Sequence, residues 1–259
     1  MGSNGGYVGY DATPTGDGTA PGVWGLRDVY LAQLRGTWPG KDPYWTSVAT
    51  LLHFDGANGS TTFTDQKGKT YSAVGNAQLS TAQSKFGGSS LLLDGTGDCI
   101  TTPDHADFAF GSGDFCIEMF VRPVSVSGFT ILAIKRNTNS GFSPFVVANN
   151  NGSLNILLSS SGSSWDFNVT SAVVLSVNTW ARVAVLRRSG MVYGIVDNAV
   201  VTTSPFSASL YSNSDKFCLG ANGDGTVAYN GYMDAVRVTK GVARYMQPPV
   251  LPAVPFPGQ

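Results

Sequence analysis

The stretch Ser89–Pro123, SSLLLDGTGDCITTPDHADFAFGSGDFCIEMFVRP, contains three short apolar runs separated by turns rich in glycine and aspartate. The first run, Leu91–Leu93, ends at Asp94–Asp98, where glycines permit the positive φ angles that a tight reversal needs. A second run covers Cys99–Pro103, and the third, from Asp114, alternates in period two. Its faces carry Phe115, Ile117, Met119 and Val121 on one side and Cys116, Glu118, Phe120 and Arg122 on the other. Because both faces carry apolar residues, we predict a strand inside a two-layer sandwich, with its second face covered by a loop or a partner.

The same pattern continues on both sides of this stretch. Strand-like runs recur at a spacing of roughly 8–12 residues, as in all-β sandwiches. Two reversals are clear: Asn149–Gly152 predicts a hairpin, and Arg187–Gly190 joins Trp180–Leu186 to Met191–Val196. We therefore predict an all-β, two-sheet antiparallel sandwich for residues 47–245.

The two flanks differ from this region in composition. Residues 1–46 are predicted to form an N-terminal arm with one short amphipathic helix over residues 23–38. A helix this short is marginal alone, so we expect it to rest on the sandwich or on a neighbouring subunit, as an attachment and oligomerisation device. Residues 246–259 are rich in proline and predict an extended strap on the surface.

Charge and hydropathy argue against two classes of partner. The chain has 16 basic and 17 acidic residues and a net charge of −1, so it lacks the basic field that phosphate backbones require. No apolar run approaches the roughly 20 residues that span a bilayer, and residues 1–21 have neither a basic head nor an apolar stretch. We expect neither nucleic acid nor membrane as a partner, and an extracellular role reached by assembly or lysis rather than by secretion.

Several separated blocks between residues 51 and 245 resemble one family in their order. They are LLHFDGANGSTTFTDQKGKTY (51–71), LLLDGTGDCIT (91–101), PDHADFAFGSGDFCIEMFVRP (103–123), NTWARVAVLRRSGMVYGIVDNAVV (178–201) and GYMDAVRVTKGVARY (231–245). Together they resemble the laminin-G-like, concanavalin A-like jelly-roll domains of bacteriophage structural proteins.

This resemblance implies a jelly roll and a non-catalytic protein on the surface of a phage virion, either a capsid decoration protein or a tail or fibre component. The expected partners are other virion proteins, further copies of the chain, with a trimer as one form, and a host surface glycan. The alternative class is a carbohydrate-active enzyme or a free lectin of the same superfamily.

The enzyme alternative depends on paired carboxylates. Sandwich glycoside hydrolases place two glutamates and an aspartate on one strand face, whereas this chain has a single glutamate, Glu118. The next positions on its face are Phe120 and Arg122, so we interpret Glu118 as a rim or salt-bridge residue; a pair of aspartates from separate loops stays open. His53, in an apolar strand, is predicted to be a packed core histidine, and His105 a solvated loop residue. We therefore predict a protein that is not an enzyme and has no cofactor.

Calcium is the one metal for which the sequence offers candidate ligands. Some domains of the family it resembles bind calcium through an Asp side chain and loop carbonyls; the resemblance gives no fixed ligand set here, and Asp94 and Asp98 are the first candidates. Similar glycine-rich turns hold three further aspartates, Asp104, Asp114 and Asp224. Asp–Gly turns need no metal, and turn chemistry is the favoured interpretation.

Cysteines and loop aromatics are the remaining candidates. Strand-like contexts and the absence of a CxxC motif predict buried free thiols, with one bridged pair left open, at Cys99, Cys116 and Cys218. Three rings stand in or beside loops, where each either stacks on a sugar or plugs an end of the sandwich: Trp165, Tyr211 and Tyr229.

Overall fold

The computed structural model describes residues 42–245 and 255–258. The helix predicted over residues 23–38 and residues 246–254 of the predicted strap lie outside the described residues. No helix in the described part has the length and apolar character to span a bilayer.

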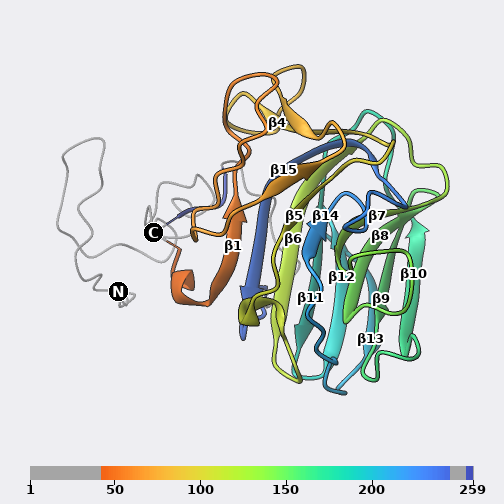
Figure 1. Ribbon diagram of the computed structural model, residues 1–259. Helices are drawn as coiled ribbons and strands as arrows, with labels where there is room; N and C mark the ends of the chain where they lie inside the picture. The colour runs from red at the N-terminus through yellow and green to blue at the C-terminus, as the bar shows by residue number, and fades with distance from the viewer. Residues whose placement is uncertain (1–41, 246–254, 259) are drawn as a thin grey trace, which may run out of the picture.

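Within the described residues, fifteen strands form two antiparallel sheets, and the expected two-sheet jelly-roll sandwich is confirmed (Figure 1). The eight-stranded sheet has the order β13-β12-β11-β6-β15-β4-β3, with β1 also paired to β15, and the seven-stranded sheet has the order β10-β9-β8-β7-β14-β5-β2. The strands are β1 (Val48–Leu52), β2 (Ser72–Val74), β3 (Gln78–Ser80), β4 (Ser90–Asp94), β5 (Cys99–Thr102), β6 (Phe115–Pro123), β7 (Phe129–Lys135), β8 (Phe145–Asn150), β9 (Ser153–Leu158), β10 (Phe167–Val173), β11 (Ala181–Arg188), β12 (Met191–Val196), β13 (Ala199–Pro205), β14 (Phe217–Leu219) and β15 (Asn230–Lys240). Helical geometry in these ranges is confined to two 3-10 turns, η1 (Trp45–Ser47) and η2 (Ala106–Phe108).

Strand β6 shows how the sheets bury both faces. Its alternate residues from Phe115 to Val121 enter the main core between the sheets. On its outer face, Cys116 and Phe120 belong to two smaller apolar clusters. The predicted cover of the second face is confirmed, and part of it is the chain's own C-terminal Phe256, which is 3% exposed.

Strand β15 joins three strands of the larger sheet. Its first half pairs with β4, its second half pairs with β1, and β6 runs along its other side. The change of partner falls at a register shift between Asp234 and Arg237, where Ala235 has a φ of 44°. Such a bulge bends a strand and lets two short strands share one edge.

The two hairpins predicted from turn chemistry are both present. Asn151 and Gly152, between β8 and β9, have φ angles of 52° and 85°, and Ser189 and Gly190, between β11 and β12, have 48° and 78°. Positive φ at both central residues is the requirement of the type I′ turn, whose twist matches that of the strands. Local turn chemistry therefore fixes the register of both hairpins.

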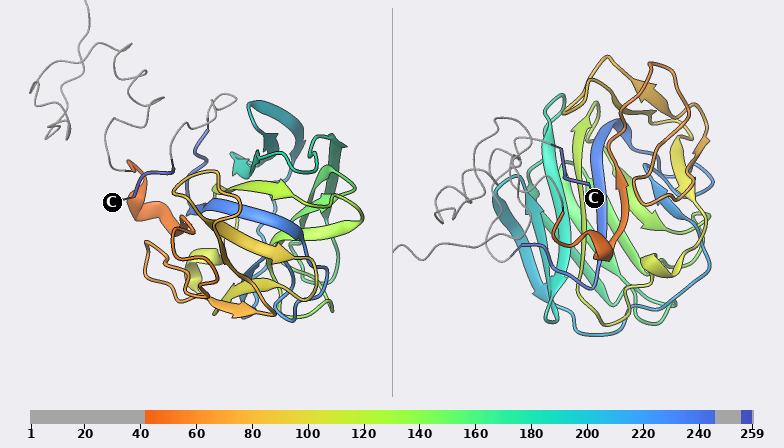
Figure 2. Two further views of the ribbon diagram at one scale, coloured as in Figure 1. Left: turned by 90° about the horizontal axis from the view of Figure 1, so that it is seen from above. Right: turned by 90° about the vertical axis from the view of Figure 1, so that its left-hand side faces the viewer.

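The two ends of the described chain lie together against the eight-stranded sheet (Figure 2). The backbone N–H of Asp42 donates to the carbonyl of Gly258 at 2.8 Å, and Phe256 packs on Val48 and Leu51 of β1. The chain therefore enters and leaves the described sandwich on one side.

Candidate functional site

Aromatic side chains from three loops of the seven-stranded sheet meet around Phe142. Trp165, in the β9–β10 loop, lies edge-on to Phe142 with ring centroids 5.1 Å apart. Tyr211, in the segment before β14, donates its hydroxyl hydrogen to the carbonyl of Phe142. The three rings are half-buried, and we call them the aromatic cluster. Trp165 also packs on the apolar outer face of β7, β8 and β9.

Glycine makes room for the Tyr211 ring. A Cβ at Gly162 would lie 2.9 Å from the ring's Cε2 atom, closer than real Cβ contacts come. The backbone N–H of Tyr211 donates to the carbonyl of Ser159 at 3.2 Å, so the β9–β10 loop holds this segment at two points.

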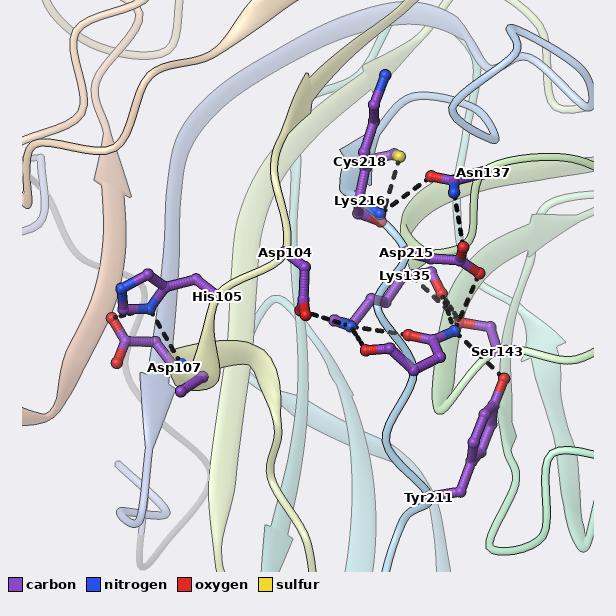
Figure 3. A network of polar contacts seen from close by, with 12 residues as sticks. Asp104, His105, Asp107, Lys135, Asn137, Ser143, Tyr211, Asp215, Lys216 and Cys218 are labelled. Carbon is purple, nitrogen blue, oxygen red and sulfur yellow. Dashed lines mark hydrogen bonds and ion pairs between the residues drawn. The ribbon is translucent and has the colours of Figure 1, made fainter.

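A buried lysine also anchors the segment before β14 (Figure 3). The Lys135 side chain, at the end of β7, is 1% exposed, and its Nζ lies 2.8 Å from Oδ1 of Asp104. The same ammonium donates to the carbonyl and the side-chain oxygen of Asn213. All three ammonium hydrogens are therefore used, and the buried charge is paired.

Amides and carboxylates surround the rings. The Asn137 amide donates to Asp215 at 2.6 Å, and Arg136 donates to Asn139 and Asn222 at 2.9 and 3.0 Å. Burial lowers the pKa of the Arg136 guanidinium, which stays charged. Beside Trp165, Asp166 is exposed, and hydrogen bonds from Ser160 and Ser164 lower its pKa to about 2.

This arrangement offers flat rings next to donors and acceptors on a partly exposed surface. Trp165 and Tyr211, which the sequence singled out, are brought together, whereas Tyr229 is 0% exposed and plugs the core. Burial raises the pKa of Tyr229 well above its usual value. Phe142 was missed; its position as a lone aromatic in the polar stretch Asn137–Pro144 is the signal that could have found it.

Glu118 lies on the outer face of the eight-stranded sheet, in a buried ionic cluster with Asp42, Arg237 and Arg244. Its Oε1 is 2.8 Å from Nη2 of Arg237, and Asp42 is 3.0 Å from Arg237 and 2.7 Å from Arg244. Burial, the largest influence, raises the pKa of Asp42, but hydrogen bonds and charge from Arg244 and the charge of Arg237 together lower it. Of the two interpretations of Glu118, the salt bridge is confirmed by the contact with Arg237, and the rim position is wrong because the side chain is 0% exposed.

The two calcium candidates, Asp94 and Asp98, accept hydrogen bonds within and beside the turn between β4 and β5. Asp98 accepts backbone N–H groups from Asn76 and Asp94 at 2.8 and 2.9 Å, and Asp94 accepts from Thr96 and the Asn76 amide. Nowhere in residues 42–245 or 255–258 do three His, Cys, Asp or Glu side chains gather as a metal-binding group. The hydrogen bonds are those of turn chemistry, and the calcium site stays a prediction.

The other three aspartates have separate partners. Asp104 pairs with Lys135, Asp114 accepts the backbone N–H of Ser189 at 2.9 Å, and Asp224 accepts from Thr226. These contacts tie loops to neighbouring strands.

The cysteines and histidines differ in how far they are buried. All three cysteines are free and buried, as predicted, and burial raises the pKa of Cys99 to about 11 and of Cys218 to about 12. His105 has a 54% exposed side chain and caps η2. The prediction of a packed core position for His53 is wrong: the chain leaves the sheet after Leu52, and His53 is half-buried in the lining of a cavity.

Comparison with known proteins places this geometry in context. A family model described as the Concanavalin A-like lectin/glucanases superfamily matches residues 94–243, more than half of the chain. No curated protein matches the sequence.

Solved structures share the fold at low sequence identity. The binding domain of Paraclostridial Mosquitocidal Protein 1 matches with a TM-score of 0.60 and 10% identity over 77% of this chain and 50% of its own, so this chain spans about half its length. Domain 4 of a GH43 extracellular arabinanase from Geobacillus stearothermophilus, in complex with arabinotriose, matches with a TM-score of 0.56 and 14% identity. The match covers 75% of this chain and 93% of that domain. Trypanosoma rangeli sialidase matches with a TM-score of 0.53 and 12% identity. The match covers 76% of this chain and 31% of the sialidase chain.

Proposed function

The chain belongs to the concanavalin A-like lectin/glucanases superfamily, and from that premise we propose that it is a non-catalytic glycan-binding protein on the surface of a phage virion. The aromatic cluster of Phe142, Trp165 and Tyr211 carries the proposal. A half-buried ring presents a flat apolar face for the C–H face of a sugar, and neighbouring amides and carboxylates supply hydrogen bonds to hydroxyl groups. Asn137, Asp166 and Asp215 provide such groups here.

The absence of catalysis is supported by the position of Glu118. A retaining or inverting glycosidase needs two carboxyl groups flanking the scissile bond. The one glutamate of the chain is buried and paired with Arg237, where a polysaccharide has no access. Because enzymes are among the fold neighbours, the absence of catalysis needs its own test. The protein is incubated with a polysaccharide that it binds, and we expect no release of reducing ends. Steady release would establish the enzyme alternative.

The virion location rests on the sequence resemblance. In this proposal residues 1–46 attach the sandwich to a capsid or tail protein, and copies of the chain associate, with a trimer as the expected form. The described chain enters and leaves beside the eight-stranded sheet, and the aromatic cluster lies on the seven-stranded sheet. Attachment at the first sheet leaves the second free for a host glycan.

Binding is tested with surface polysaccharide from the host cell, immobilised and probed with purified protein. Trp165→Ala should lose about tenfold or more in affinity, the magnitude expected for removing a stacked ring. Phe129→Ala is the matched control, because Phe129 is 40% exposed on β7 and stands outside the cluster. Equal binding by the wild type and Trp165→Ala would overturn the site.

Location is tested by mass spectrometry of purified particles. We expect the chain in particles, and its loss from them when residues 1–41 are deleted. The deletion stops before Asp42 because this side chain is buried in the ionic cluster. A chain that never appears in particles would contradict the virion role but not the glycan site.

A further inference from the structure

A second concave site lies at the end of β1, away from the aromatic cluster and on the other sheet. It is a cavity of about 220 Å³ lined by His53, Phe54, Asp55, Thr64, Gln66 and Leu79. Leu79 belongs to β3, so the cavity lies between the end of β1 and β3 of the eight-stranded sheet. The proposed glycan surface does not use any of these residues.

The backbone at the cavity departs from ordinary strand geometry. His53, Phe54 and Asp55 follow directly after Leu52, the last residue of β1, and all three line this cavity. Phe54 has a φ of 59°, which is unusual for a bulky aromatic residue and costs on the order of 1–3 kcal/mol. Strain of this kind concentrates at functional sites, and here it falls in the lining of the cavity.

A buried polar atom is left without a partner beside the cavity. Among the described residues, Nδ1 of His53 is buried and makes no hydrogen bond. Burial lowers the pKa of His53, and the charge of Arg237 lowers it further while Asp55 opposes the change. The imidazole is therefore neutral at pH 7, with one ring nitrogen that donates and one that accepts.

The mouth of the cavity carries three more hydrogen-bonding side chains on a fixed frame. Asp55, Thr64 and Gln66 are exposed, and the backbone N–H of Gln66 donates to the carbonyl of Leu51 at 2.9 Å. Asp65 accepts the N–H of Leu51 at 2.8 Å, which ties this segment to β1. The backbone beside Thr64 and Gln66 is thus fixed to β1 before a ligand arrives.

We propose that this cavity binds one neutral polyhydroxylated ring, a single sugar unit. Its volume equals that of about seven liquid water molecules, which is below that of drug-sized pockets. The lining includes a carboxylate and no Lys or Arg, which disfavours anions, and a single carboxylate with a neutral imidazole is a poor cation site. The lining combines an amide, a hydroxyl, a carboxylate and an imidazole with the apolar Phe54 and Leu79, the kinds of group that contact the hydroxyl groups and the C–H face of a sugar.

The two histidines of the chain make the test specific. The imidazole 15N resonances of the full-length protein are followed while methyl glycosides of glucose, galactose, xylose and N-acetylglucosamine, and glycerol, are added to about 100 mM, where millimolar complexes saturate. We expect a saturable shift of His53 with at least one pyranoside and no shift of the exposed His105. Unmoved His53 resonances with every probe, or equal shifts of both rings, would overturn the proposal.

Variants separate this cavity from the aromatic cluster. Gln66→Ala should weaken the His53 response about tenfold, with the same melting temperature because Gln66 is exposed. Trp165→Ala should leave the response unchanged, so that failure of the proposed glycan surface and failure of this cavity give different results. An unchanged response in Gln66→Ala, or its loss in Trp165→Ala, contradicts a separate site.

Discussion

The outer faces of the two sheets use polar groups in opposite ways. On the eight-stranded sheet, Asp42, Glu118, Arg237 and Arg244 are buried and paired with one another, and the ring of Phe256 lies 4.1 Å from the guanidinium of Arg237. On the seven-stranded sheet, rings are half-buried and amides and carboxylates reach the surface. Charges that satisfy each other away from water hold a structure together, whereas groups that keep part of their surface free are available to a ligand.

The largest expected effect is on the first face. Arg237→Ala leaves Glu118 buried without its guanidinium and should cost about 3–5 kcal/mol of unfolding free energy, measured by denaturant unfolding. Arg122→Ala is the control: Arg122 is half-exposed on β6, the strand of Glu118, and its loss should cost less than about 1 kcal/mol. Equal costs would contradict the structural role of the ionic cluster.

A smaller effect on the same sheet depends on pH. Burial, the largest influence, raises the pKa of Asp234 from 3.8 to about 7, against hydrogen bonds from the N–H groups of Phe86, Lys85 and Ala235. A raised carboxyl pKa means that the folded state binds the extra proton, so its contribution to stability falls as pH rises from about 4 to about 7. Asp234→Asn should be less stable overall, since it has one oxygen for three N–H donors, but should lack this decline. A decline of the same size in Asp234→Asn would assign it to other groups.

The smallest effect is expected in the aromatic cluster. Tyr211→Phe keeps the ring and removes the hydrogen bond to the Phe142 carbonyl, so unfolding free energy should fall by about 1 kcal/mol and glycan affinity a few-fold. Thermal unfolding and binding titration measure the two changes. Unchanged affinity would show that the position of Phe142 does not matter for binding.

Local signals explain what the sequence predicted well. The hairpins at Asn151–Gly152 and Ser189–Gly190 follow from residues that favour positive φ, and the alternation of β6 follows from period two. The two-layer sandwich follows from these elements together with the family resemblance. The position of the helix predicted over residues 23–38 is not described, so that prediction stays untested.

Long-range pairing explains what the sequence missed. Arg237 meets Glu118 across 119 positions and Asp42 across 195, and no local pattern selects such partners. Trp165 and Tyr211 were named separately, but their meeting around Phe142 depends on how three loops close over one sheet. The cavity at His53 lies where Phe54 takes a positive φ, which the apolar sequence before Asp55 does not indicate.

The difference between the two outer faces is tested most directly by mapping amide NMR shifts of the full-length protein as the host glycan is added. The account predicts that the shifted amides gather in residues 135–143, 159–166 and 211–216, the loops that form the aromatic cluster. Shifts concentrated instead around Glu118, Arg237 and Arg244, with these three loops unchanged, would contradict it.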